Sequence, residues 1–283
     1  MSEKLVDISN RIENMRQLDS VVLAMRGIAA SRAQQSRELL EPIEAYSGVV
    51  ARAIAEAVAL SPDIDAVRPA DGEEREVLVL FCAEHGFAGA FSELVLDAAA
   101  DHIGAAEVML VGTRGNAIAQ ERGTRADWSG SMASQVNGVV AVADRVASAL
   151  YERMSDSGAG RVGVIYPALD EMRRVTVRRI SLLPLDTQQF GRAPLTEPPL
   201  ISVDAQTLLE QLTAEYVYAE LCMAAMHSFA AENNARLEAM SAAGNNIEHK
   251  LGELRNTANQ VRQEEVTAEI VELAAGSFAA RHE

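Results

Sequence analysis

Apolar residues recur at alternating steps of three and four along the last third of the chain. Residues 200–283 contain no proline, so nothing there forces a helix to end. The a/d spacing predicts a helix that packs along a second helix in a left-handed coiled coil. The repeating positions, apolar at all but the glycine, are Leu237, Met240, Gly244, Ile247, Leu251, Leu254, Ala258 and Val261.

The first 41 residues are also free of proline and carry a matching seam. Its positions are Leu5, Ile8, Ile12, Met15, Leu18, Val22, Met25 and Ile28. A long helix at each end of the chain predicts an antiparallel pair made from the two termini. Pro42 is expected to kink the first helix or divide it, because an interior proline removes a backbone hydrogen bond.

Between these helices, short apolar runs alternate with helical stretches. Continuous apolar runs predict buried strands at 77–82, 108–111 and 162–166. Helices are predicted at 91–100, 116–120 and 136–154, and the alternating run 174–180 indicates an edge or solvent-facing strand. This order predicts a mostly parallel sheet. The expected fold class is therefore α/β plus a long antiparallel coiled coil, with a central Rossmann-like α/β domain.

Three segments follow from these patterns. Residues 1–60 are predicted to form an N-terminal coiled-coil helix and 75–195 the central α/β domain. Residues 203–283 are predicted to form the C-terminal coiled-coil helix that pairs with 1–60. The segment 61–72 (SPDIDAVRPADG) has the composition of a linker, and Asp204 is a suitable N-cap for the last helix.

Composition narrows the possible functions. Aromatic residues make up only 4% of the 283 residues, which favours close helix packing over an aromatic-lined ligand cleft. The net charge is −16 and no basic run exceeds two residues, so nucleic acid is an unsuitable partner. No apolar run approaches the roughly 20 residues that cross a bilayer, so no direct membrane insertion is expected. Cys82 and Cys222 lie in apolar stretches and are expected to be buried thiols.

Two glycine-bearing turns are candidates for binding a phosphate. Residues 84–91 (EHGFAGAF) follow the first predicted strand, and 112–115 (GTRG) follow the second. The spacing is not that of a dinucleotide or P-loop motif, so tight turns are the expected role of the glycines. We expect no cofactor, and the five histidines lack metal-ligand spacing. His85 with Glu84 remains a candidate acid–base pair.

The apolar spacing changes after Val261. The next apolar positions follow at a step of five and then four and three, a shift that alters how paired helices wind. Arg262 and Gln263 lie at this break, where guanidinium and amide donors suit the carboxylates of a partner. A solvated helix face is the alternative interpretation.

Several segments, in order and at matching spacing, resemble the gamma subunit of F-type rotary ATP synthases. The opening helix is similar at Asp7, Ile8, Arg11, Ile12, Ala24, Met25, Ala29, Ala30 and Arg32. The glycine turn is similar at Gly86 and Gly89, and residues 181–185 (SLLPL) resemble the exit from the central domain. The last helix is similar at Ala235, Arg236, Met240, Ala243, Asn246, Asn259, Arg262, Gln263, Thr267, Glu269, Ile270, Glu272 and Gly276. The chain departs from the family at Gly27, inside the first helix, and in 13 acidic against 5 basic residues over 203–283.

The resemblance implies a central-stalk rotor subunit without catalytic residues of its own. Such a subunit couples ion flow through a membrane ring to ATP synthesis or hydrolysis at the beta subunits. The implied partners are the alpha, beta and epsilon subunits and the c-ring, on the cytoplasmic face of the bacterial inner membrane. Residue by residue, Asn259, Arg262 and Gln263 would contact a beta-subunit loop, and Met25 and Arg281 would lie in the rotor bearing.

Two other functions are compatible with the same residues. One is a coiled-coil adaptor that carries an α/β module and has no part in rotation. The other is an enzyme that uses the loop 85–89.

Overall fold

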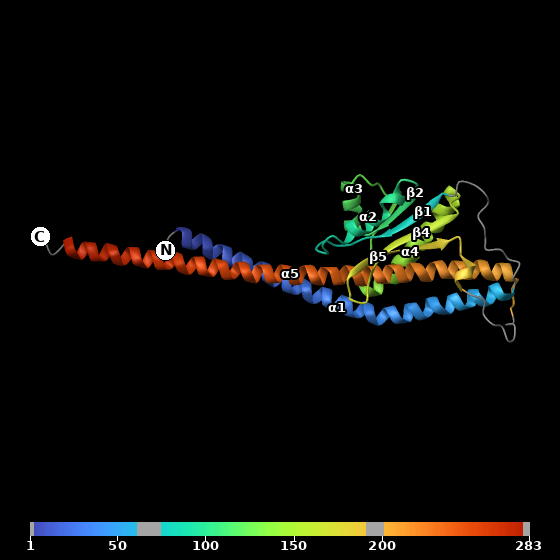
Figure 1. The fold of residues 1–283 in the computed structure, drawn as a ribbon, viewed down its shortest axis with the longest axis horizontal. Helices are drawn as coiled ribbons and strands as arrows, with labels where there is room; N and C mark the ends of the chain where they lie inside the picture. The colour runs from blue at the N-terminus through green and yellow to red at the C-terminus, as the bar shows by residue number, and fades with distance from the viewer. Residues whose placement is uncertain (1–2, 61–74, 191–200, 280–283) are drawn as a thin grey trace. The chain divides into compact units, whose positions relative to one another are not determined.

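The computed structural model describes residues 3–60, 75–190 and 201–279. The chain divides into two compact units, one made of residues 1–28 with 237–283 and the other of 29–236. Two long helices, α1 (Glu3–Leu60) and α5 (Ala205–Ala279), contribute to both units (Figure 1). No helix among the described residues is both long and apolar enough to cross a membrane.

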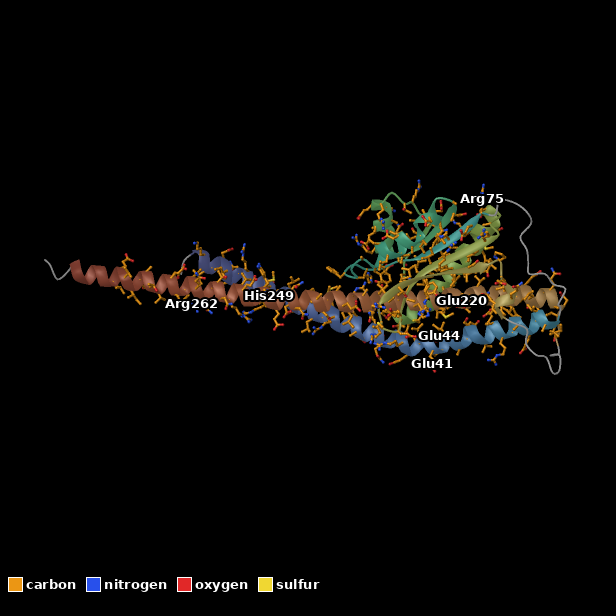
Figure 2. The ribbon with its side chains drawn as sticks, in the orientation of Figure 1. Glu41, Glu44, Arg75, Glu220, His249 and Arg262 are labelled. Carbon is orange, nitrogen blue, oxygen red and sulfur yellow. The ribbon has the colours of Figure 1, made fainter. Side chains whose placement is uncertain are left out.

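Helix α1 continues through Pro42 without a break. The expected division into two pieces is therefore wrong, and the alternative, a kink, is what Figure 2 shows near Glu41 and Glu44. Pro42 is exposed, so its ring faces solvent. The free-energy cost of this proline to the helix is therefore limited to the lost hydrogen bond and the bend. Packing of the residues on either side against α5 holds the helix together.

In the first unit, α1 and α5 run antiparallel and pack through a small apolar core. Val22, Met240, Ile247 and Leu251 are buried there, with Met25 partly buried against them. The predicted pairing of the two ends of the chain is confirmed. Two predicted seam positions are wrong, because Leu18 and Ile28 are 46% and 52% exposed; after Met25, the next buried position is Ala29, one residue later than predicted.

The same two helices also pair in the second unit. The Ser47 hydroxyl donates a hydrogen bond of 2.8 Å to Glu220 Oε1, and Val50 and Ile54 pack with Leu209. Helix α5 begins as predicted, since both carboxylate oxygens of Asp204 accept hydrogen bonds from Thr207. The side-chain cap satisfies a backbone N–H that has no partner within the helix.

A five-stranded sheet forms the centre of the second unit. Its order is β3-β2-β1-β4-β5, parallel except for the antiparallel β4–β5 pair. The strands are β1 (Glu76–Phe81), β2 (Ala106–Val111), β3 (Trp128–Gly130), β4 (Arg161–Leu169) and β5 (Val175–Leu183). The helical elements between and after them are α2 (Phe91–Ile103), α3 (Thr113–Glu121), η1 (Val136–Gly138), α4 (Val139–Ser157) and η2 (Thr187–Phe190).

Both faces of this sheet are covered, which confirms the predicted α/β class. Alternate β1 residues point to opposite sides: Val79 packs with α4 and α5, whereas Leu80 packs with α2 and α3. The predicted edge strand is β5. Strand β3 was not predicted, because three residues with one apolar side chain carry no recognisable pattern.

Candidate functional site

The loop that follows β1 is fixed to α5 by a buried ion pair. Glu232 and Arg236 lie one turn apart, and their side chains are 3% and 6% exposed. Glu232 accepts hydrogen bonds from the backbone N–H groups of Glu84 and His85, at 3.1 and 3.2 Å. Arg236 donates to the carbonyls of His85 and Gly86, at 3.1 and 3.2 Å. Each buried charge is thus matched by an opposite charge and by loop backbone, as burial requires.

The Glu84 carboxylate fixes the next turn through hydrogen bonds in a similar way. Its carboxylate accepts hydrogen bonds from the Thr113 N–H and hydroxyl, at 3.0 and 2.9 Å, and from the Met132 N–H at 2.6 Å. Thr113 is the first residue of α3. A carboxylate at a helix N-terminus is stabilised by the free N–H groups and the helix dipole.

The chain's own carboxylates therefore occupy the positions where a phosphate would bind in the two glycine turns. The glycines of the second turn serve close packing: a Cβ on Gly112 would lie 2.5 Å from the Cys82 carbonyl oxygen. A Cβ on Gly115 would lie 2.1 Å from the Cys82 Cβ. At the second turn these contacts support the tight-turn interpretation. In the first turn Gly89 has a φ of +61°, whereas a Cβ on Gly86 would meet nothing within 4 Å.

The candidate acid–base pair does not form. The Glu84 carboxylate is directed to Thr113 and Met132, and the His85 ring lies 3.2 Å from the Ser134 hydroxyl instead. Burial, with Glu232 and Glu93 nearby, raises the pKa of the Cys82 thiol to about 12, so this cysteine is a poor nucleophile. Within the described residues, no group of three metal-ligating side chains is found.

A second polar cluster lies between α1, α5 and the sheet, with the His227 side chain largely buried and Glu44 exposed. The His227 ring stacks on Tyr166 with centroids 5.9 Å apart, and its Nε2 lies 4.0 Å from Glu44. Burial and the nearby Arg178 lower the pKa of His227 to about 4. Burial also raises the pKa of Glu220, although the hydrogen bond from Ser47 opposes this.

We expect His227 to make the stability of the second unit depend on pH. Its pKa is about 6.5 when unperturbed and about 4 in the fold, so the unfolded chain binds the proton more tightly. The stabilisation is complete well above pH 6.5, is lost progressively as the pH falls from 6.5 towards 4, and changes no further below the folded-state pKa. Lowering the pH from 7.5 to 5 should reduce the free energy of unfolding by about 2 kcal/mol through this site. Urea unfolding at both pH values should show that His227→Gln removes this part of the loss.

His249→Gln is the matched control, because the His249 side chain on the same helix is 78% exposed. It should leave the pH dependence as in the wild type. Identical pH slopes for His227→Gln and the wild type would show that the burial of His227 does not control its protonation.

The residues predicted to contact a partner lie on the last part of α5. Asn259, Arg262 and Gln263 are all exposed. Leu251 is 7% exposed, but Val266, Ile270 and Leu273 are 49%, 61% and 69% exposed. The predicted break in spacing therefore coincides with the point where α5 presents apolar side chains to solvent.

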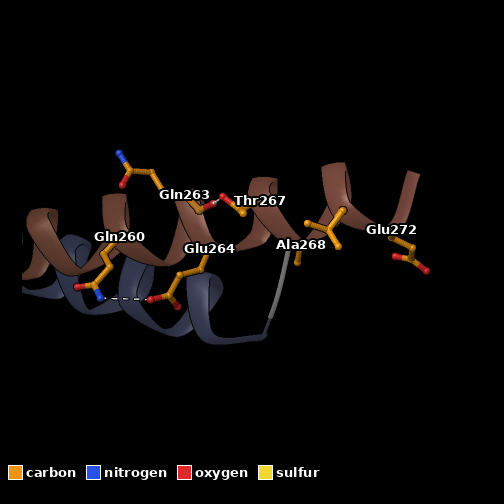
Figure 3. Close-up of a pocket in the computed structure, with 7 residues that line it drawn as sticks. Gln260, Gln263, Glu264, Thr267, Ala268 and Glu272 are labelled. Carbon is orange, nitrogen blue, oxygen red and sulfur yellow. Dashed lines mark hydrogen bonds between the residues drawn. The ribbon is translucent and has the colours of Figure 1, made fainter. Parts of the chain in front are cut away.

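A shallow hollow of about 710 Å³ runs along this part of α5. All seven described residues that line it, from Gln260 to Glu272, belong to α5. Figure 3 shows the 3.2 Å hydrogen bond from Gln260 to Glu264, with Gln263 pointing away from that pair. One face of one helix cannot enclose a small molecule, so this surface suits a protein partner.

Of the two residues predicted to lie in the rotor bearing, the structure describes only one. Met25 is partly buried against the core of the first unit, so its side chain packs between α1 and α5. Arg281 lies outside the described residues.

Sequence reasoning missed the role of Glu232. The segment 229–236 (FAAENNAR) does contain a signal, because it places an acid and an arginine four residues apart within an otherwise apolar stretch. Such an i, i+4 pair in a buried helix indicates a polar network.

Comparison with known proteins gives a consistent result over the whole chain. A family model described as ATP synthase matches residues 4–280. The ATP synthase gamma chain of Leifsonia xyli subsp. xyli is 26% identical over 298 residues, covering 99% of this chain and 98% of the relative. That of Nocardioides sp. is 26% identical and covers 98% and 96%.

Solved structures show the same fold. A chain of the Euglena gracilis mitochondrial ATP synthase (OSCP/F1/c-ring, rotational state 3) has a TM-score of 0.67 at 14% identity, covering 99% of this chain and 95% of that chain. A chain of the Tetrahymena thermophila mitochondrial ATP synthase central stalk/c-ring has a TM-score of 0.59 at 18% identity, covering 79% and 99%.

Proposed function

The chain belongs to the ATP synthase gamma family, and from this premise we propose which of its surfaces act in the rotor. It is a central-stalk rotor subunit of an F-type ATP synthase and a non-catalytic member of that complex. It interacts with other ATP synthase subunits, and the complex is membrane-associated.

The proposed axle consists of residues 1–60 paired with 203–283, and the proposed α/β module of residues 75–195. In this arrangement alpha and beta subunits surround the paired ends of the chain. The epsilon subunit and the c-ring bind at the other end, on the cytoplasmic face of the bacterial inner membrane. A 75-residue helix is about 110 Å long, and pairing it with α1 resists bending and twist.

The proposed partner contact rests on the change in exposure of apolar side chains along α5 after Val261. Before this point apolar side chains pack against α1; after it Val266, Ile270 and Leu273 are exposed. Arg262 and Gln263 lie at the transition, and within the described residues no ion pair holds the Arg262 guanidinium. We assign Asn259, Arg262 and Gln263 to a hydrogen-bonded contact with a loop of the beta subunit.

The test is the double variant Arg262→Ala with Gln263→Ala in the purified complex. A hydrogen bond to a charged group contributes about 1.5–3 kcal/mol, so coupled ATP turnover should fall about tenfold or more while the complex still assembles. Both side chains are exposed, so the stability of the chain should not change.

Arg255→Ala with Asn256→Ala is the matched control, one heptad earlier on α5. It should leave turnover close to that of the wild type. Equal turnover in both double variants would show that Arg262 and Gln263 are not part of the contact. Failure of the chain to co-purify with alpha and beta subunits would favour the adaptor function instead.

A further inference from the structure

A short polar stretch of α5 binds the two loops that follow the neighbouring strands β1 and β4. Its residues Glu232, Asn234 and Arg236, which we call the clamp, are each 5% exposed or less. Glu232 and Arg236 bind the backbone of residues 84–86. The Asn234 amide donates to the Arg173 carbonyl, and the Arg173 guanidinium donates to the Asn234 side-chain oxygen, both at 3.1 Å. One turn of one helix therefore holds both loops.

The sheet-facing positions of α5 before the clamp are mainly apolar. Val217, Leu221, Ala225 and Phe229 are at most 1% exposed in the core that α5 shares with the sheet. Apolar attraction is non-directional, so these contacts hold α5 against the sheet but tolerate small sliding displacements. Hydrogen bonds require a donor–acceptor distance of about 2.7–3.2 Å and good alignment. The clamp therefore sets the rotation angle of α5 about its own axis more strictly than the apolar contacts do.

A small rotation of α5 is enough to break the clamp. Side-chain atoms of a helix lie about 5–6 Å from its axis, so a rotation of about 20° displaces them by about 2 Å. The hydrogen bonds from the clamp to the backbone of the two loops measure 3.1–3.2 Å. They are already at the long end of the normal range, so a displacement of this size would break them.

Both loops contain a residue other than glycine in the left-handed region. The φ angle is +63° at Phe87 and +62° at Arg173. Backbone strain of this kind persists only where the surrounding contacts over-determine the conformation. Arg236 binds the carbonyl of Gly86, next to Phe87, and Asn234 binds the carbonyl of Arg173 itself. The clamp therefore fixes the conformation of both loops as well as their position.

The clamp connects the sheet to the part of α5 that enters the first unit. The second unit ends at Arg236, and α5 continues in the first unit from Leu237. On the sheet side, the carboxylate of Glu84 in the clamped loop binds the N–H groups of Thr113 and Met132. The hydrogen bonds that start at the clamp thus reach the segments after β1, β2, β3 and β4.

We propose that the clamp transmits torque between α5 and the α/β module as the rotor turns. The proposal rests on the proposed function, because a rotor subunit must pass rotation along its length. Glu232, Asn234 and Arg236 are positioning residues in this role. They fix the angle between α5 and the sheet and take no part in the chemistry of ATP. When the clamp is weakened, α5 should twist within the second unit before the module follows it.

The test measures this twist in the purified complex, held on a surface through its beta subunits without nucleotide. A bead is attached to the α/β module through Ser148→Cys, an exposed position on α4. The variance of the bead angle should be at least twofold higher in Asn234→Ala than in the parent with Ser148→Cys alone. Arg173→Ala removes one of the two hydrogen bonds from the loop side, so it should raise the variance by a smaller amount.

Two control variants separate torque transmission from stability. Arg174→Ala changes the neighbouring arginine, which binds Asp170 of its own hairpin, and should leave the variance at the parent value. Val217→Ala truncates a buried apolar contact of α5. It should lower the midpoint of urea unfolding and also leave the variance unchanged.

Three outcomes would overturn the proposal. They are a parental variance in Asn234→Ala, equal variances in Arg173→Ala and Arg174→Ala, and a rise in Val217→Ala as large as that in Asn234→Ala. If Asn234→Ala does not assemble, the two arginine variants decide, because both side chains are exposed. ATP should rotate the bead on the parent complex. If it does not, the proposed function itself fails, so the two failures are distinguishable.

Discussion

Glu232→Ala is expected to destabilise the second unit by about 3–5 kcal/mol, because it leaves the guanidinium of Arg236 buried without its countercharge. The Arg236 side chain is only 6% exposed, so water cannot replace the lost carboxylate. The N–H groups of Glu84 and His85 lose their acceptor in the same variant. Urea unfolding of the full chain, followed by circular dichroism, measures the change.

Asp97→Ala is the matched control. It removes the partner of Arg122, but these side chains are 60% and 43% exposed, so the loss should stay below about 1 kcal/mol. Equal losses in Glu232→Ala and Asp97→Ala would mean that the Glu232–Arg236 pair is no more important than a surface ion pair.

Gly112→Ala is expected to destabilise the second unit by about 3 kcal/mol or more. Gly112 has a φ of +118°, which side chains other than glycine rarely adopt, and its added Cβ would lie 2.5 Å from a backbone oxygen. Strain and overpacking therefore add at one position, and the backbone atoms it meets cannot move aside as a side chain could. Thermal unfolding of the full chain should show a clearly lower midpoint.

Gly27→Ala should have the opposite effect. A Cβ at Gly27 meets nothing within 4 Å, and the residue lies inside α1. Alanine is favoured over glycine in a helix by about 1 kcal/mol, so this variant should raise the midpoint. A lower midpoint for Gly27→Ala, or an unchanged one for Gly112→Ala, would contradict the geometry at that glycine.

The elements of the fold could be predicted where they depend only on residues that are close together in the sequence. The spacing from Leu237 to Leu251 depends only on neighbouring turns of one helix, and the apolar run 77–82 marks its own strand. Strand β3 could not be predicted because its place depends on pairing with β2, which its three residues do not encode. The exposure of Ile28 has a related cause, since the partner helix decides which residue of a turn faces the seam.

The same contrast between local and long-range information applies to the candidate sites. The break after Val261 is a property of the local sequence, and the structure finds solvent-exposed apolar residues beyond it. The role of Glu84 depends on Thr113 and Met132, which lie 29 and 48 residues away. Glu232 lies 148 residues from the N–H group of Glu84. No spacing within a single element predicts contacts of this range.

The burial of both native cysteines has a practical consequence for labelling experiments. Cys82 and Cys222 are 0% and 6% exposed, and burial raises the pKa of both thiols. Maleimide reagents attack accessible thiolates, so neither native residue should compete with a cysteine introduced on an exposed face. A fluorescent reporter could then be attached at one chosen point while Cys82 and Cys222 stay in place.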